Sequence, residues 1–334
     1  MIQNQAPDFA WQNGRIVPWH ECVLHARSQG AFWGANVFEG IRGYWDGDAP
    51  DGRLLLFRVA DHLARLERSM RSLRMDIEYS ADDLASAIND LIIANGWRQL
   101  VHVCVVSYFD EGPNFDPLAP TEDTGVHITA TPMTRGPGYR DGVSASISSW
   151  RRISDDAMPP RIKAGANYHN SRLAHHEAVR NGYDTTVILN QRGTVAEAPG
   201  ACVVMVRDGR LVTPPGTSGV LEGITVATIG ELAAEELGVV LERREIDRTE
   251  LYVADEVFLC GTMAELLPIT SLDRLPIGSG GPGPLTKRLQ ELYELAVHGR
   301  TGQAKQWTTE VPLPAPERES ESLSVSGSAP AGTD

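Results

Sequence analysis

Two short runs rich in glycine and alanine constrain this chain most, because they place one lysine and one carboxylate on either side of a helix and a strand. The first run is Lys-Ala-Gly-Ala-Asn-Tyr at residues 163–168, and the second is Thr-Val-Ala-Glu-Ala-Pro-Gly at residues 194–200. A lysine in such a turn can form an imine with a carbonyl cofactor, and a carboxylate can pair with a nitrogen of the cofactor's ring. The two runs predict a cofactor pocket between Lys163 and Glu197.

Further motifs follow one another in a specific order along the chain. They are an Asn13-Gly14 hairpin signal, Val-Phe-Glu-Gly-Ile-Arg at 37–42, Phe-Arg-Val-Ala-Asp-His at 57–62, Leu-Glu-Gly-Ile-Thr at 221–225, Leu-Tyr-Val-Ala-Asp-Glu-Val-Phe at 251–258, Gly-Thr-Met-Ala-Glu at 261–265 and Gly-Pro-Leu-Thr-Lys-Arg at 283–288. In these motifs the chain resembles the fold-type-IV pyridoxal-phosphate enzymes, and most closely the branched-chain amino-acid aminotransferases. The Phe-Glu-Gly-Ile-Arg run separates that group from D-amino-acid aminotransferases and aminodeoxychorismate lyases.

The resemblance implies a two-domain fold of mixed α+β and α/β character, the D-amino-acid aminotransferase-like fold. We expect an N-terminal α/β domain at residues 1–130, an interdomain linker at 131–138, a C-terminal α/β domain carrying the cofactor lysine at 139–307, and a disordered tail at 308–334. The linker is rich in Pro and Gly, which break helices and strands. The tail has almost no apolar clustering to offset the entropy of ordering it.

Apolar spacing and capping residues predict the main helices and strands. We expect a helix from Asp61 with Asp61 as its cap, a helix from Ser80 with Asp83 in its first turn, a strand at 100–106, a helix at 171–180, a strand at 185–190, a hairpin turn at Asp208-Gly209, and a helix at 224–237 closed by Gly238.

Composition limits the classes of partner. The 30 Lys and Arg against 44 Asp and Glu give a net charge of 30 − 44 = −14, which disfavours binding to a phosphate backbone or to anionic lipid. The sequence shows neither a secretory leader nor an apolar run long enough to span a bilayer. We therefore expect a cytoplasmic protein that binds small molecules, with neither nucleic acid nor membrane as a partner.

The resemblance assigns pyridoxal 5'-phosphate as the cofactor and gives three residues roles at its ring. Lys163 is expected to hold the cofactor as an internal aldimine and then to move the proton between the substrate and the cofactor. Glu197 is expected to pair with the pyridine nitrogen and keep it protonated. Tyr168 is expected to hydrogen-bond the phenolic oxygen of the cofactor.

The cofactor phosphate requires positive charge and backbone donors, and the resemblance points to three separate elements. Arg58 offers a guanidinium that suits phosphate oxygens. Gly223, Ile224 and Thr225 open a helix, whose free N–H groups and dipole favour an anion. Thr262 adds a hydroxyl from the turn that follows a strand.

The substrate side departs from the family pattern. Trp33, Val101 and Val103 stand where that pattern has tyrosine and arginine residues. Side chains alternate along a strand, so both valines point to the same face. A shift of one residue in the alignment would put His102 on that face instead. The residues that we expect on this side are Trp33, Phe38, Arg42, Val101, Val103, Met263 and Ala264. The hypothesis is an aminotransferase with an altered, more apolar pocket, whose small-molecule amino donor or keto acceptor carries a bulky apolar group.

Other functions stay open at this point. They are an amine or D-amino-acid transaminase, a lyase of the aminodeoxychorismate type, and a cofactor carrier without catalysis. The resemblance also implies a homodimer with the cofactor close to the subunit interface. We expect no metal site, because His175 and His176 are adjacent on a helix and face different ways.

Overall fold

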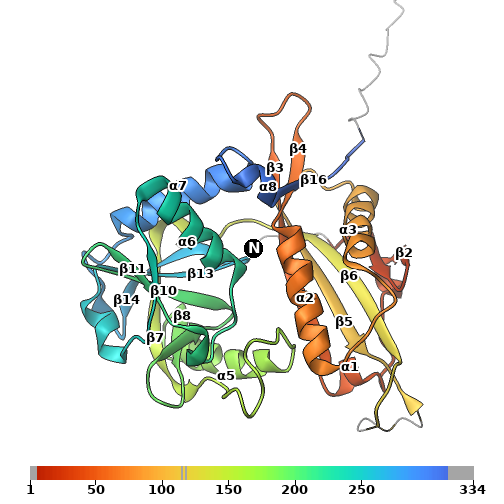
Figure 1. Cartoon of the computed structure of the whole chain (residues 1–334), viewed down its shortest axis with the longest axis horizontal. Coiled ribbons are helices and arrows are strands. Elements are labelled where there is room, and N and C mark those ends of the chain that lie inside the picture. Colours follow the sequence, from red (N-terminus) through yellow and green to blue (C-terminus); the bar gives the residue numbers. More distant parts are fainter. Residues whose placement is uncertain (1–5, 114–115, 117–118, 315–334) are drawn as a thin grey trace, which may run out of the picture.

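The computed structural model describes residues 6–113, 116 and 119–314, which form two domains built on separate sheets (Figure 1). Within this part of the chain, the first sheet has seven strands in the order β16-β4-β3-β5-β6-β1-β2. Their bounds are β1 (Phe9–Gln12), β2 (Arg15–Pro18), β3 (Asn36–Asp46), β4 (Arg53–Phe57), β5 (Val101–Phe109), β6 (Thr124–Pro132) and β16 (Thr308–Glu310). All the pairings in this sheet are antiparallel.

The first domain also carries the helices α1 (Gln29–Phe32), α2 (Val59–Leu73) and α3 (Ala81–Asn95). The predicted cap of α3 is confirmed: the Asp83 N–H donates to Ser80 Oγ at 3.2 Å, and the Asp83 carboxylate accepts from the Ser80 N–H at 2.9 Å. This reciprocal pair satisfies two N–H groups at the helix start.

The predicted cap of α2 is wrong by three residues, because the helix begins at Val59 and not directly after Asp61. The cap position is Arg58, whose backbone is left-handed with φ of 57°. Asp61 lies in the first turn of α2, and its carboxylate accepts from Arg58 Nε at 2.5 Å. An acidic group in the first turn still favours the helix through the dipole.

The second domain is a sheet that closes on itself. Strands β7, β8, β9, β10, β13 and β14 form a barrel, because β9 pairs with both β8 and β10. The strand bounds are β7 (Val143–Arg151), β8 (Thr185–Leu189), β9 (Val195–Ala198), β10 (Ala201–Arg207), β11 (Arg210–Thr213), β12 (Leu241–Arg243), β13 (Glu256–Gly261), β14 (Glu265–Leu272) and β15 (Leu275–Pro276). One apolar cluster, which includes Val187, Val203, Val257 and Ile269, unites side chains from several of these strands.

The helices of the second domain are α4 (Gly138–Asp141), α5 (Asn167–Arg180), α6 (Ile224–Leu237), α7 (Pro284–Val297) and α8 (Ala304–Trp307). The bounds predicted for α6 are confirmed, and Gly238 follows it in the left-handed conformation with φ of 66°. Helix α5 begins four residues before the predicted start at residue 171. Tyr168 therefore lies in the first turn of α5.

The chain returns to the first domain at its described C-terminal end (Figure 1). Thr308–Glu310, which we expected in a disordered tail, instead form β16 against β4, and Val311 is buried. Antiparallel pairing with β4 and the packing of Trp307 against Phe57 offset the entropy of ordering these residues. The remainder of the predicted tail, 315–334, lies outside the described residues.

The predicted linker overlaps an element, since β6 runs through residues 131 and 132 before α4 begins at Gly138. The domain boundaries themselves stay predictions. Among the described residues, the structure contains no helix that is both long and apolar enough to cross a membrane.

Candidate active site

A cavity of about 300 Å³ lies between the two domains. From the first domain it is lined by Phe38 and Gly40 of β3, Arg65 of α2 and His102 of β5. The second domain supplies the residues around Lys163, the β9–β10 turn, the start of α6 and the end of β13. The volume is at the lower end of the range of ligand pockets.

Lys163 lies in a turn that is fixed to the first domain by backbone hydrogen bonds. The Phe38 N–H donates to the Lys163 carbonyl at 3.0 Å, and the Gly165 N–H donates to the Asn36 carbonyl at 3.2 Å. Residue 165 must be small, because a Cβ there would lie 2.4 Å from Asn36 Oδ1. The glycine of the lysine run thus lets the second domain approach β3 closely.

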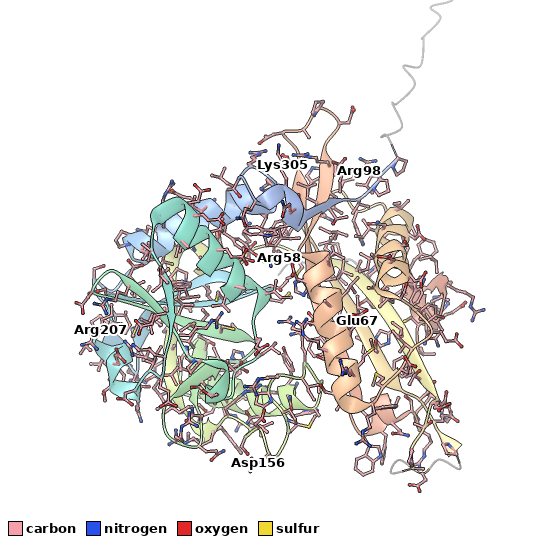
Figure 2. All side chains as sticks on the ribbon, in the orientation of Figure 1. Arg58, Glu67, Arg98, Asp156, Arg207 and Lys305 are labelled. Atoms are coloured by element: carbon pink, nitrogen blue, oxygen red, sulfur yellow. The ribbon has the colours of Figure 1, made fainter. Side chains whose placement is uncertain are left out.

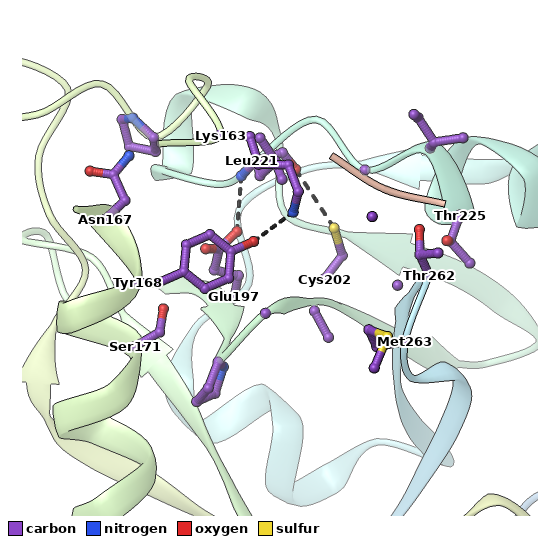
Figure 3. A pocket seen from close by; sticks show the side chains of 18 of the residues that line it. Lys163, Asn167, Tyr168, Ser171, Glu197, Cys202, Leu221, Thr225, Thr262 and Met263 are labelled. Carbon is purple, nitrogen blue, oxygen red and sulfur yellow. Dashed lines mark hydrogen bonds between the residues drawn. The ribbon is translucent and has the colours of Figure 1, made fainter. Parts of the chain in front are cut away.

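The Lys163 amine points at the hydroxyl of Tyr168 (Figure 3), with a distance of 2.6 Å between Nζ and Oη. Its Nζ also lies 4.7 Å from the centre of the Phe38 ring and 5.1 Å from that of Tyr168. The two rings contact each other at 4.9 Å between centroids. The amine is therefore held over an aromatic surface at the cavity wall.

Glu197 is almost fully buried on β9, where it faces the same cavity. Arg152 Nη2 lies 2.8 Å from Glu197 Oε1. The Leu221 N–H donates to Oε2 at 2.9 Å (Figure 3). Burial raises the pKa of Glu197, while the Arg152 cation and the Leu221 N–H act in the opposite direction. The site thus holds a buried carboxylate that is already partnered on both oxygens.

The start of α6 forms another wall, where Gly223, Ile224 and Thr225 line the cavity together with Thr262. Gly223 is the cap residue and has no side chain to occupy the first N–H groups of the helix. A Cβ at this position would lie 2.7 Å from Cys202 Sγ. Helix starts of this kind bind anions, because their N–H groups and dipole favour negative charge.

Arg58, which we expected beside this helix start, does not line the cavity. Figure 2 shows it at the N-terminal end of α2. Its guanidinium contacts Asp61, donates to Thr228 Oγ1 at 3.2 Å and pairs with Glu231 at 3.4 Å. It also lies 4.9 Å from the centre of the Trp307 ring. The Arg58 side chain thus packs against the first two turns of α6 and against Trp307, outside the cavity.

Arg65 was not among the residues predicted from the sequence to belong to the site. It lies on α2, is 6% exposed and lines the cavity. Its Nη1 donates to the Glu222 carbonyl at 2.8 Å, directly before the start of α6. In the sequence, Arg65 lies between apolar residues on the buried face of α2. Arginine is rarely buried without a partner, so its position on this face could have indicated a functional role.

The expected substrate residues are distributed between the cavity and its surroundings. Phe38 and Met263 line the cavity. Arg42 is buried behind it, where Nη1 pairs with Glu265 at 3.3 Å and donates to the carbonyls of Thr262 and Met263 at 3.2 and 3.3 Å. Arg42 thus holds the β13–β14 turn, which also contains Ala264, and neither Arg42 nor Ala264 is a lining residue.

Val101 and Val103, which we expected on the substrate side, do not line the cavity. Both are fully buried in the core of the first domain. Alternation along β5 then directs His102 to the opposite face, where it lines the cavity. The absent side chain of Gly40 leaves room for it: a Cβ there would lie 2.6 Å from His102 Nε2. Burial, with Arg42, Lys163 and His62 nearby, lowers the pKa of His102 to about 4, so its imidazole is neutral at pH 7.

Trp33 also lies away from the cavity. It follows α1, its side chain is 57% exposed, and its ring contacts Phe32 at 5.1 Å between centroids. The short helix directs both rings to the surface of the chain.

Known proteins resemble this chain over nearly all of its length. The model of the family Amino-transferase class IV matches residues 36–272, more than half of the chain. The probable branched-chain-amino-acid aminotransferase of Aquifex aeolicus is 37% identical, with 93% of this chain and 99% of the relative covered.

Solved structures agree with this result. The crystal structure of the branched-chain amino acid aminotransferase of Thermobaculum terrenum in its PLP form has a TM-score of 0.85 and 44% identity, and the match covers 92% of this chain and 99% of the other. The branched-chain aminotransferase of the archaeon Thermoproteus uzoniensis, solved with norvaline, has a TM-score of 0.85 and 36% identity, with 91% and 99% covered. The chain therefore belongs to the class IV aminotransferases, which are transaminases that depend on pyridoxal 5'-phosphate.

Proposed function

We propose that this transaminase moves the amino group of an L-amino acid with a branched or similarly bulky apolar side chain to a 2-oxo acid, with Lys163 as the residue that carries the cofactor. The observation that supports this most is the single cavity that brings together Lys163, Tyr168 and Glu197. The two solved proteins described above are both named as branched-chain aminotransferases, and one of them was solved with norvaline, an amino acid with an apolar side chain.

The residues present fit the cofactor, since the donor set has a distinct group for each of its parts. Pyridoxal phosphate supplies an aldehyde that bonds to amines and a ring that accepts electrons from the substrate carbon. We assign Lys163 to the aldehyde, Tyr168 to the phenolic oxygen and Glu197 to the ring nitrogen. The start of α6, with Thr262 and Arg65, is assigned to the phosphate.

Lys163 has a second role in this proposal. Once the substrate amine replaces it, its free Nζ can take a proton from the substrate carbon and return it later. The Tyr168 hydroxyl lies 2.6 Å from Nζ and would hold the free amine at the cavity wall. The bond-forming step and the proton transfer thus depend on one side chain.

The remaining wall, formed by Phe38, His102 and Met263, is the side that we assign to the substrate. These three residues carry no positive charge at neutral pH, and the arginines that line the cavity are paired with other residues, Arg65 with Glu39 and Arg152 with Glu197. A second carboxylate, as in glutamate, would therefore meet a neutral imidazole and apolar groups on this wall. Loss of one charge-assisted contact costs about 1.5–3 kcal/mol, so glutamate is expected to be the weaker donor.

This assignment predicts the result of a donor titration followed by the visible absorbance of the bound cofactor. L-Leucine is expected to bleach the band at a concentration at least about 10-fold lower than L-glutamate requires, because one charge-assisted contact is missing for the second carboxylate. Equal or tighter binding of glutamate would contradict the apolar wall. Bleaching only by a D-amino acid or a simple amine would favour those transaminases, and release of pyruvate from aminodeoxychorismate would favour a lyase.

Two arginines, one directly before α2 and one within it, give a second prediction. Arg65→Ala is expected to weaken pyridoxal phosphate binding about 10- to 100-fold, because a charge-assisted contact to the phosphate is lost. Arg58→Ala is the matched control from the same segment. It should leave cofactor affinity within about 2-fold of the unmodified chain, because this variant keeps Arg65 and its charge-assisted contact to the phosphate. Cofactor affinity is measured by spectroscopic titration of each full-length variant. The reverse pattern would restore the assignment of Arg58.

We also propose a homodimer, supported by the adjacent exposed rings of Phe32 and Trp33. Large apolar side chains that gather at a surface are typical of interaction sites. The mass of the protein in solution, measured by analytical ultracentrifugation, tests this proposal. The cytoplasmic location stays a prediction.

A further inference from the structure

Glu39 is a carboxylate with no solvent exposure in the middle of β3. Its neighbours Phe38 and Gly40 line the cavity, whereas alternation directs Glu39 to the other face of the sheet, toward α2. There it accepts from Arg65 Nε at 2.6 Å and Nη2 at 2.8 Å, and His62 Nδ1 lies 2.7 Å from its Oε2. Glu39 therefore contacts the cavity only through another residue.

The three side chains form a compact charged cluster. Burial opposes ionisation of Glu39, but the hydrogen bonds and charges of Arg65 and His62 hold its pKa down at about 2. Burial lowers the pKa of His62, so at neutral pH His62 is uncharged and donates from Nδ1. The pair of Glu39 and Arg65 is then neutral overall, as buried ions require.

The geometry of this cluster fixes the plane of the Arg65 guanidinium. Arginine has five N–H donors in a rigid fork. The hydrogen bonds to Glu39 and to the Glu222 carbonyl use three of them, one each on Nε, Nη2 and Nη1. One N–H on each terminal nitrogen is left for an anion in the cavity that Arg65 lines. A guanidinium fixed in this way loses little entropy when it binds phosphate.

We propose that Glu39 is a positioning residue, which aims the two remaining N–H groups of Arg65 at the phosphate of the cofactor. This inference rests on the proposed assignment of Arg65 to that phosphate. A carboxylate repels phosphate by itself, so its benefit depends on Arg65 standing between the two. If Glu39 has this role, substituting it lowers the affinity for the cofactor phosphate, and this effect can be measured separately from any effect on folding.

The test compares two cofactors in one variant. In Glu39→Gln, pyridoxal phosphate is expected to bind about 10-fold more weakly and to leave the diluted holoenzyme correspondingly faster. The reason is that the Arg65 guanidinium is no longer held in the orientation of its charge-assisted contact to the phosphate. Pyridoxal, which lacks the phosphate and so makes no such contact, should bind the same variant within about 2-fold of the unmodified chain. Both affinities are read from the visible absorbance band on titration of the full-length protein.

A matched control is Glu256→Gln. Glu256 is also a buried carboxylate, but it accepts from the N–H groups of Leu285 and Thr286 at 2.9 and 2.7 Å, at the start of α7. This variant should lose stability to denaturant without changing the ratio of the two cofactor affinities. If Glu39→Gln fails to fold, Glu39→Asp keeps the charge and shortens the reach, and the same selective loss is expected.

Two results would overturn the proposal in distinguishable ways. If Arg65→Ala lowers the affinity for pyridoxal phosphate selectively and the Glu39 variants do not, Glu39 is only a structural partner. If Arg65→Ala itself has no selective effect, the assignment of Arg65 to the phosphate is wrong, and the positioning role of Glu39 falls with it.

Discussion

Replacing Lys163 with alanine is expected to lower the transamination rate at least about 10⁴-fold. General acid–base catalysis alone contributes about 10²–10⁴-fold, and Lys163→Ala removes the covalent attachment as well. Binding of the cofactor should persist in weakened form, because the contacts assigned to Arg65, Glu197 and the start of α6 remain. The measurement is the rate of a coupled transaminase assay with L-leucine as the donor.

The chain provides clean controls for this variant. Its only lysines are Lys163, Lys287 and Lys305, and Lys287 and Lys305 are exposed on α7 and α8. Lys287→Ala and Lys305→Ala should keep the full rate. Borohydride reduction of the holoenzyme, followed by peptide mass spectrometry, should place the cofactor mass on the peptide of Lys163. Its recovery on either other lysine would contradict the assignment.

Local patterns in the sequence were sufficient for several parts of the structure. The capping box of Ser80 and Asp83 and the end of α6 at Gly238 depend on residues within one helix turn, so a short stretch of sequence determines them. The grouping of Lys163, Tyr168 and Glu197 was also predictable, through the resemblance carried by their two runs. Spacing alone shows which residue types are present, but not that they meet in one cavity.

The failures share a physical cause, which is that small shifts along an element change which way a side chain points. A shift of one residue on β5 exchanges Val101 and Val103 for His102, because side chains alternate between faces. Arg58 takes the cap position of α2 and its guanidinium contacts Asp61 and Thr228, whereas Arg65, two turns further along the helix, lines the cavity. Strand β16 depends on pairing with β4, which lies far earlier in the chain, and local propensity does not encode that pairing.

Replacing Glu197 with glutamine has the second-largest expected effect. In the proposed site a carboxylate here keeps the ring nitrogen of the cofactor protonated, which glutamine cannot do. Removal of one preorganised electrostatic partner costs about 10²–10³-fold in kcat. The same change leaves Arg152, which is 4% exposed, without its carboxylate. Breaking a buried ion pair in this way destabilises a protein by about 3–5 kcal/mol.

The loss of rate and the loss of stability can be separated with a second substitution. The double variant Glu197→Gln, Arg152→Gln removes both buried charges, so its free energy of unfolding is expected to recover relative to Glu197→Gln alone. Its kcat should stay low, because no carboxylate faces the ring nitrogen. Denaturant unfolding and the coupled assay measure the two quantities on the same preparations. If kcat recovered together with stability, Glu197 would act only as the partner of Arg152, and the ring nitrogen would need another group to hold its proton.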